Sequence, residues 1–310
     1  MQQGENGSAR TVGFLSALGA FSLWGVLPLY WTQVGHVPAL EIIWHRVLWG
    51  ALVAWVVIFW RRRGGRTGDR APLVPSRRTL AWMVLNGILV VTNWLVYVWA
   101  VSSGRTLDAS LGYYINPLVS VFLGMVFFGE RLSRLQWGAV ASASVGVLYM
   151  AVRLGAFPWV SLTLAFTFGT YGLIKKRTAL SSIHGLALEL SPLAVVAAAF
   201  IAIGLLGGSG VPIGGDWRAA GFLLGGGVVT VVPLLLFGIA ARRIRLSDVG
   251  FMQYIAPTLM FLIAVAVFGD PLEPDRLVGF VFVWIGLSLY TAANRMDAAR
   301  RRRVVVGSRP

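Results

Sequence analysis

The 310-residue chain contains no cysteine and only three histidines. Without cysteine there is no disulfide framework, thiolate metal site or cysteine nucleophile. The histidines, His36, His45 and His184, lie in different segments and form no pair at helical i,i+4 spacing that would hold zinc. The glycine-rich stretch at 207–215 lacks the lysine of a Walker loop and is typical of a flexible connection. The sequence therefore predicts neither a metal site nor a cofactor.

Charged residues are also scarce, at 13% of the chain, whereas hydrophobic residues make up 57%. Soluble domains carry about 25% charged residues, so this composition indicates an integral membrane protein. Apolar stretches of about 20 residues, each long enough to cross a bilayer core as a helix, recur along almost the whole chain. We predict ten spans, over residues 11–32, 38–60, 79–101, 107–128, 135–152, 155–174, 185–206, 217–240, 247–268 and 276–293.

The formal net charge of +15 does not indicate nucleic-acid binding, because the basic residues follow the predicted topology instead of one face. With the N-terminus inside, 22 of the 27 basic residues fall in cytoplasmic segments. The opposite side holds four, and Arg46 lies within a span. The positive-inside rule thus predicts that both termini are cytoplasmic. The arginine runs at 61–63 and 300–303 are expected to contact anionic lipid.

One segment occurs twice, once in each half of the chain. YYINPLVSVFLGMVFFGE at 113–130 resembles QYIAPTLMFLIAVAVFGD at 253–270, with a proline at the same place and a Phe-Gly-acid ending. Membrane composition alone would not align these features, so we interpret the pair as an internal repeat. Five spans separate the copies, an odd number, so the second half should enter the membrane upside down. Such inverted repeats are typical of secondary transporters that work by alternating access.

Pro117 and Pro257 fall near the centres of the two repeated spans. A proline inside a helix removes one backbone donor and clashes with the carbonyl four residues back. Either proline alone is interpretable as a packing kink. Their symmetry, beside Tyr114 and Tyr254 and near Asn116 and Gln253, favours a bent, polar cavity wall that acts in gating.

Several motifs carry a resemblance to a known family. They are WG at 24–25, EIIWHR at 41–46, NW at 93–94, LDASLGYYINPL at 107–118, GER at 129–131 and GFMQYIAPTLMF at 250–261. They resemble the RarD proteins of the EamA group, within the drug/metabolite transporter superfamily, and the similarity extends over about residues 11–293. The resemblance implies an all-α fold of ten transmembrane helices in a bacterial inner membrane, built as two inverted five-helix repeats.

The expected division is a first repeat at 11–152, a second at 155–293, and cytoplasmic tails at 1–10 and 294–310. The resemblance also implies that spans 1–4 and 6–9 surround a central cavity. It implies export or exchange of small metabolites or drugs. No residue identifies chloramphenicol, a solute often linked to these proteins, as the substrate.

Four ionisable residues lie well inside the spans: Glu41, His45 and Arg46 in the second span, and Glu189 in the seventh. Such residues are rare in membranes and are functional candidates by default. A buried ion pair that fixes helix positions is an equally supported alternative. Glu41 and His45, four residues apart, should share a helix face, whereas Arg46 should find its partner elsewhere. We predict a fixed positive charge at Arg46, proton exchange at Glu41 beside His45, and a counterpart role for Glu189. Lys175 and Lys176 are expected to snorkel to the cytoplasm.

Aromatic side chains are candidates for the wall of a pocket that binds a planar or amphipathic solute, although span ends often carry aromatic belts instead. The candidates are Trp24, Trp94, Tyr97, Tyr113, Tyr114 and Tyr171, with the polar Asn93 from the NW motif. The expected partners are a small-molecule substrate, membrane lipid and protons. A membrane-embedded enzyme and a channel are the alternatives, but no nucleophile elbow, histidine cluster or carbonyl filter is visible.

Overall fold

The computed structural model describes residues 2–64, 75–208, 216–271 and 274–307, and within these ranges the chain is helical and contains no strand. One short 3₁₀ helix, η1 (Thr32–Val34), follows the first helix. The α-helices are α1 (Gln2–Trp31), α2 (Ala39–Arg63), α3 (Arg77–Ser102), α4 (Thr106–Phe128), α5 (Arg134–Leu154), α6 (Trp159–Arg177), α7 (Ser182–Leu206), α8 (Trp217–Arg243), α9 (Leu246–Met252), α10 (Ile255–Ala266) and α11 (Pro274–Gly307).

Each predicted span coincides with a helix or, in one case, with a pair of helices. Among the described residues, nine segments are long and apolar enough to cross a membrane, with α9 and α10 counted together as Leu246–Ala266. The remaining predicted span, 155–174, corresponds to α6, which has 19 residues and ends in Lys175-Lys176-Arg177. Four serine and threonine residues make α6 less apolar, and they are Ser161, Thr163, Thr167 and Thr170.

The ninth predicted span is broken into α9 and α10 at Gln253–Tyr254. Pro257 has no N–H to donate to the carbonyl of Gln253, so that carbonyl instead accepts from the amide of Ala256 at 3.1 Å. Pro257 then lies in the first turn of α10, where a missing N–H leaves no helical bond unmade. The equivalent helix α4 runs continuously through Pro117.

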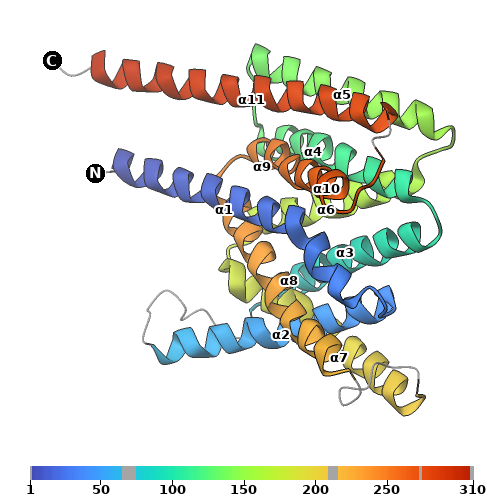
Figure 1. Cartoon of the computed structure of the whole chain (residues 1–310). Helices are drawn as coiled ribbons and strands as arrows, with labels where there is room; N and C mark the ends of the chain where they lie inside the picture. Colours follow the sequence, from blue (N-terminus) through green and yellow to red (C-terminus); the bar gives the residue numbers. More distant parts are fainter. Residues whose placement is uncertain (1, 65–74, 209–215, 272–273, 308–310) are drawn as a thin grey trace.

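Figure 1 shows the beginning of α1 and the end of α11 on the same side of the molecule, with α5 lying along α11. The Ser142 hydroxyl donates to the carbonyl of Phe282 at 2.8 Å across this contact. A Cβ on Gly286 would lie only 2.9 Å from the carbonyl oxygen of Ala139, so glycine permits the close approach of the two backbones. Small residues commonly serve this purpose between membrane helices, where apolar burial cannot drive packing.

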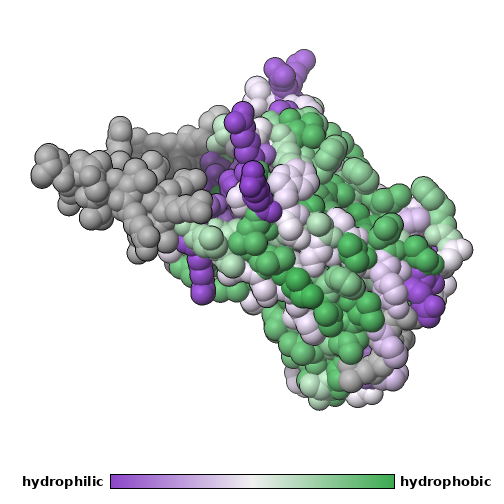
Figure 2. Space-filling view, turned by 90° about the horizontal axis from the view of Figure 1, so that it is seen from above, coloured by the Kyte–Doolittle hydropathy of each residue, from purple (hydrophilic) through white to green (hydrophobic). Residues whose placement is uncertain are grey.

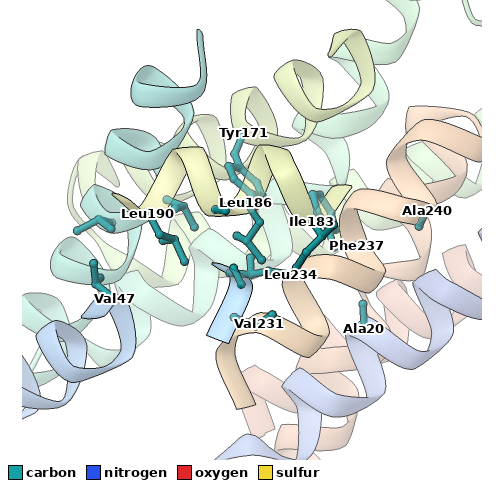
Figure 3. Packing of buried hydrophobic residues seen from close by; sticks show 14 of the residues in the cluster. Ala20, Val47, Tyr171, Ile183, Leu186, Leu190, Val231, Leu234, Phe237 and Ala240 are labelled. Atoms are coloured by element: carbon teal, nitrogen blue, oxygen red, sulfur yellow. The ribbon is translucent and has the colours of Figure 1, made fainter. Parts of the chain in front are cut away.

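The largest core cluster joins α1, α2, α6, α7 and α8 (Figure 3). Tyr171 and Phe237 lie at its centre, with ring centroids 5.7 Å apart and an interplanar angle of 20°. Leu186 of α7 and Val231 of α8 are also buried there. This cluster holds together helices from both halves of the chain.

The outside of the bundle is apolar. Figure 2 shows hydrophobic residues over much of the coloured surface. Large side chains such as Trp60, Leu148 and Leu206 are mostly exposed, with 77%, 67% and 90% of their surface accessible. Exposed apolar surface of this extent requires a lipid environment. The chain is therefore a multi-pass membrane protein.

The repeated Phe-Gly-acid motif forms the same local structure in both places. Gly129, after α4, and Gly269, after α10, have φ values of 62° and 72°, in the left-handed region that favours glycine. In both, the amide of the acidic residue reaches back six positions: Glu130 donates to the Gly124 carbonyl at 3.2 Å, and Asp270 to the Ala264 carbonyl at 3.0 Å. The two helix ends therefore match, each with a left-handed glycine and a backbone bond of the same span.

A second repeated motif lies at the start of the two segments. Arg105 and Asp108 form an ion pair at 3.3 Å before and inside α4, and Arg245 and Asp248 form one at 2.9 Å before and inside α9. Both pairs span three residues, as helical spacing allows. The Asp248 carboxylate also accepts from the Tyr290 hydroxyl at 2.9 Å, which ties α9 to α11.

Candidate functional site

A cavity of about 450 Å³ lies between α1, α2, α3, α4, α6 and the α9–α10 pair. Its lining reaches Ala39, the first residue of α2, and Ser102, the last residue of α3, both of which are exposed. The cavity therefore opens at this end of the bundle, which we call the mouth. The volume lies within the range of about 300–1,000 Å³ that is usual for small-molecule sites.

Arg46 supplies the positive charge of the cavity. It lies seven residues into α2, or about 10 Å along the helix axis. Its Nε donates to the hydroxyl of Thr230 on α8 at 3.1 Å. Its guanidinium carbon lies 4.3 Å from the ring centroid of Trp94 and 5.2 Å from that of Trp31, within cation–π range of both. The contacts of Arg46 outside its own helix are thus a hydroxyl and two aromatic rings, and neither an acidic side chain nor a backbone carbonyl accepts from it among the described residues.

Three amide side chains line the cavity at depth. Asn93 donates through Nδ2 to the carbonyl of Leu164 at 2.8 Å and to the hydroxyl of Thr167 at 2.9 Å, which joins α3 to α6. Gln253 lies at the α9–α10 break and donates to Ser120 at 3.2 Å. Asn116 is 7% exposed and is the third of these lining residues.

The inner end of the cavity is closed by aromatic rings. Trp24 packs edge-on to Phe168 with centroids 5.6 Å apart, and both line the cavity. Phe237 lies 5.8 Å from Trp24, and Tyr171 stacks on Phe237. Tyr171 has no exposed surface. We refer to Trp24, Phe168, Tyr171 and Phe237 as the aromatic floor.

Half of the sixteen residues predicted for the site line this cavity. They are Trp24, Arg46, Asn93, Trp94, Tyr97, Tyr113, Asn116 and Gln253. Tyr171 belongs to the aromatic floor but is not among the lining residues. Tyr114 and Tyr254 lie instead in the core with α5 and α11, where the Tyr254 hydroxyl donates to the Tyr114 carbonyl at 3.0 Å. Pro117 and Pro257 are buried on their helices beside them.

Glu41 and His45 are buried behind the cavity wall, at 7% and 4% exposure. His45 Nε2 lies 4.0 Å from Glu41 Oε1, so the expected sharing of one helix face is confirmed. The indole N–H of Trp49 donates to His45 Nδ1 at 3.0 Å. Neither Glu41 nor His45 is among the residues that line the cavity.

Glu189 lies on the far side of the aromatic floor. Its carboxylate forms an ion pair with Lys175 at 2.8 Å and accepts from Asn86 at 2.9 Å and from the Tyr171 hydroxyl at 3.4 Å. Lys175 is only 3% exposed, so the expectation that it snorkels to the surface is wrong. The buried carboxylate on the neighbouring helix, which sequence spacing did not reveal, compensates its charge.

The sequence separation of the repeated segments gives Glu189 a counterpart other than Glu41. Gly87 of α3 packs against the backbone of Glu189, and Gly227 of α8 packs against the backbone of Trp49. Gly87 and Gly227 have the same separation in the sequence as Tyr114 and Tyr254, so they are equivalent positions of the repeat. At the same separation, the counterpart of Glu189 is Trp49, which lies on α2 beyond Glu41. A carboxylate is thus present at this position in one half only.

Beyond the aromatic floor, Glu130 joins the end of α4 to the start of α9. Its two carboxylate oxygens accept from the amides of Leu246 at 2.6 Å and Ser247 at 2.9 Å. Lys176 lies 3.9 Å from the same carboxylate and donates to the carbonyls of Ala241 and Ile244. We call this region the closed end.

Comparison with known proteins decides the family. The EamA-like transporter family matches the chain twice, over residues 11–152 and 158–292. The chain belongs to this family. An uncharacterized transporter of Pseudomonas aeruginosa is 43% identical over 90% of this chain and 93% of that protein. The Protein RarD of Escherichia coli is 39% identical over 94% and 96%, which confirms the resemblance seen in the motifs.

A crystal structure with 20% sequence identity superposes with a TM-score of 0.68, over 92% of this chain and 99% of the other. At this identity the likeness shows a shared fold. The chain is thus an EamA-like transporter with a helical membrane fold.

Three residues in or near this EamA-like site were not predicted as functional from the sequence: Thr230, Trp31 and Glu130. Thr230 and Trp31 contact Arg46, but a threonine inside a span and a tryptophan at a span end carry no distinctive signal. Glu130 appears in the sequence only as the acid of the repeated Phe-Gly-acid ending. Its recurrence as Asp270, at the same place in the second repeated segment, was the available signal for a structural role.

Proposed function

We propose that the chain is a secondary carrier that moves a small organic solute across the bacterial inner membrane by alternating access. The observation that carries this proposal is a cavity that opens at one end of the bundle and is closed at the other by the aromatic floor. A cavity reaching about halfway through the bundle fits one state of a carrier. A channel would need a continuous path, which the packed rings interrupt.

The proposed architecture is a pair of inverted repeats, residues 11–152 and 155–293. Two contacts between equivalent positions of the repeat support it: Tyr114 with Tyr254, and Ser142 with Phe282. When a two-fold axis relates two halves, equivalent positions meet only near that axis. The matching helix ends at Gly129 and Gly269 agree with the same relation.

The two halves differ at one element, and this difference fits a single state of an alternating-access cycle. The helix α4 is continuous through Pro117, whereas its equivalent is divided into α9 and α10. In the opposite state we expect the two segments to exchange these conformations. Pro117 and Pro257 allow each segment to lose its regular hydrogen bonds at low cost.

In our proposed topology both termini are cytoplasmic, on the charge distribution. The mouth lies at the end of the bundle opposite the beginning of α1, so the described state faces outward. The closed end, with Glu130 and Lys176, then faces the cytoplasm. Position 68, a natural labelling site for this topology, lies outside the described residues.

Proton coupling is assigned to Glu41 with His45. They form a buried acidic and basic pair on α2, and His45 directly precedes Arg46 of the cavity. Movement of α2 would therefore change the environments of the pair and of Arg46 together. The Glu41→Gln variant retains size and hydrogen bonding but cannot titrate. It should abolish uptake driven by a pH gradient and retain exchange at equal pH. A variant that responds to the gradient like the wild type would contradict the assignment.

Counterflow in proteoliposomes tests the proposed function. An excess of unlabelled solute inside should transiently concentrate labelled solute from outside, and the initial rate should saturate with concentration. A rate that stays linear and shows no overshoot would indicate a channel. A chemically altered solute recovered from the vesicles would indicate a membrane-embedded enzyme.

A further inference from the structure

The cavity holds one charged side chain, Arg46, and no carboxylate among the described residues that line it. The Thr230 hydroxyl accepts from Nε, and the guanidinium carbon lies over the rings of Trp94 and Trp31. The two terminal nitrogens donate no hydrogen bond to any other described residue. The guanidinium is therefore fixed in position while its forked edge stays available to a ligand.

An arginine held this deep in a membrane protein needs an anion or several acceptors to replace water. Within the described part of the chain, Thr230 gives one acceptor and the rings give cation–π contact. Arginine forms its strongest geometric match with a carboxylate or phosphate, through two parallel N–H···O bonds. The remaining walls are mainly apolar and aromatic, which favours an organic body over a small inorganic ion.

Deeper in the cavity two neutral acceptors are left without a partner. The side-chain oxygens of Asn116 and Gln253 are buried and accept no hydrogen bond from the described residues. Asn116 lies ten residues into α4, or about 15 Å from the mouth, roughly 5 Å deeper than Arg46. Buried acceptors of this kind are costly unless a ligand or water donates to them.

We infer that the cavity takes a small organic carboxylate with an aromatic or apolar body and a neutral hydrogen-bond donor at its far end. The inference rests on the proposed carrier function and names its substrate class. Arg46 binds the carboxylate near the mouth, the tryptophans and tyrosines contact the body, and Asn116 and Gln253 accept from the donor. No lining carboxylate in the described residues pairs with an ammonium group, so an amine is disfavoured.

Four probes that share one body test this class on the purified protein. They are p-hydroxyphenylpropionate, its primary amide, tyramine and tyrosine. Binding is measured by the change in intrinsic tryptophan fluorescence and by the rise in Tm, neither of which requires transport. The carboxylate should bind at least about tenfold more tightly than the amide and tyramine, because only it forms charge-assisted bonds with Arg46.

Arg46→Gln should reduce this preference for the carboxylate over the amide to less than about twofold. Arg46→Lys, which keeps the charge but not the fork, should retain part of it. Arg218→Gln is the matched control, because Arg218 is exposed at the mouth end of the bundle and its side chain donates to Gln33. It should leave the preference unchanged. If Arg46→Gln does not fold, Arg46→Lys and the probe series on the wild type decide the question.

Equal binding of amide and carboxylate by the wild type would overturn the inference, as would tighter binding of tyramine or tyrosine. Retention of the preference in Arg46→Gln would also overturn it. The two proposals fail separately. Selective carboxylate binding without counterflow would refute the carrier and leave the ligand class intact. Counterflow of tyramine but not of the carboxylate would refute the ligand class and leave the carrier intact.

Discussion

The hydroxyl of Tyr254 donates at 3.0 Å to the backbone carbonyl of Tyr114, its equivalent in the first repeated segment. The tyrosine that precedes the repeated Ile-x-Pro in one half thus contacts the same tyrosine in the other half. This contact lies between α4, which is continuous, and the break that separates α9 from α10. A movement that interchanges these two conformations must alter this contact. Substitutions around it therefore test the gating proposal most directly.

Glu130 should stabilise the outward-facing state, because it links α4 to the start of α9 only while the closed end is packed. Glu130→Gln retains one acceptor oxygen and loses the charge. We expect a shift of about 2 kcal/mol, or roughly 30-fold, toward the inward-facing state. Labelling of a cysteine at the closed end by a reagent added from the cytoplasmic side measures this shift.

Asp270→Asn provides the opposite test. Asp270 follows α10 as Glu130 follows α4, and it is exposed. By analogy with Glu130, we expect its carboxylate to accept from the amides of Thr106 and Leu107 in the inward-facing state. Asp270→Asn should therefore favour the outward-facing state by a similar factor. Shifts of the same sign in both variants would show that the two acids are not equivalent gates.

Glu189 and Lys175 should behave as a structural pair. Glu189→Ala leaves Lys175 as a buried cation without its 2.8 Å partner, which should lower the free energy of unfolding by about 3–5 kcal/mol. Lys175→Met combined with Glu189→Leu should recover most of that loss, because two apolar side chains replace the pair. Unfolding in detergent measures both. A stable single variant that has lost transport would instead indicate a coupling role.

Pro117→Ala and Pro257→Ala should each slow transport more than they reduce folding. Alanine restores the backbone donor and would favour the continuous helix over the divided one. A bias of about 1 kcal/mol changes the ratio of the two transport states about fivefold. Pro192→Ala is the control, because Pro192 also lies inside a helix, α7, but on its exposed face. Wild-type rates in both test variants would show that the prolines serve only packing.

Much of the helical fold was predictable because the local sequence of each helix is an apolar run between charged or glycine-containing ends. The boundaries of α4, predicted at 107–128 and found at 106–128, show how well this works. The break between α9 and α10 was not located, because Pro257 and Pro117 have the same local sequence signal and only one helix is divided. That difference depends on the packing of the whole bundle.

The candidate site was predictable where depth alone decides the environment. Arg46 lies too far along α2 to snorkel easily to the membrane surface, so an acidic group, backbone carbonyls or an anionic substrate was expected to compensate its charge. Lys175 was misinterpreted because a lysine at a helix end is able to point either way, and the choice depends on Glu189 of the neighbouring helix. Contacts between helices of this kind leave no periodic trace in the sequence.

The proposed topology predicts labelling from opposite sides of the membrane. Ser102→Cys lies at the mouth and Arg63→Cys at the end of α2, both at exposed positions. The chain has no cysteine of its own, so each label reports one site. An impermeant reagent added to intact spheroplasts should modify position 102 and leave position 63 unmodified until the membrane is opened. The reverse pattern would invert the topology.

Reciprocal accessibility of Ile42→Cys and Ser182→Cys tests alternating access most directly. The two positions are equivalent in the repeat; Ile42 lines the cavity, and Ser182 lies at the closed end beside Gly238. Alternating access predicts that any condition which raises labelling of position 42 from outside lowers labelling of position 182 from inside. The conditions to compare are a substrate gradient and the variants Glu130→Gln and Asp270→Asn. Labelling rates that rise together at both positions, or that do not respond to substrate, would contradict it.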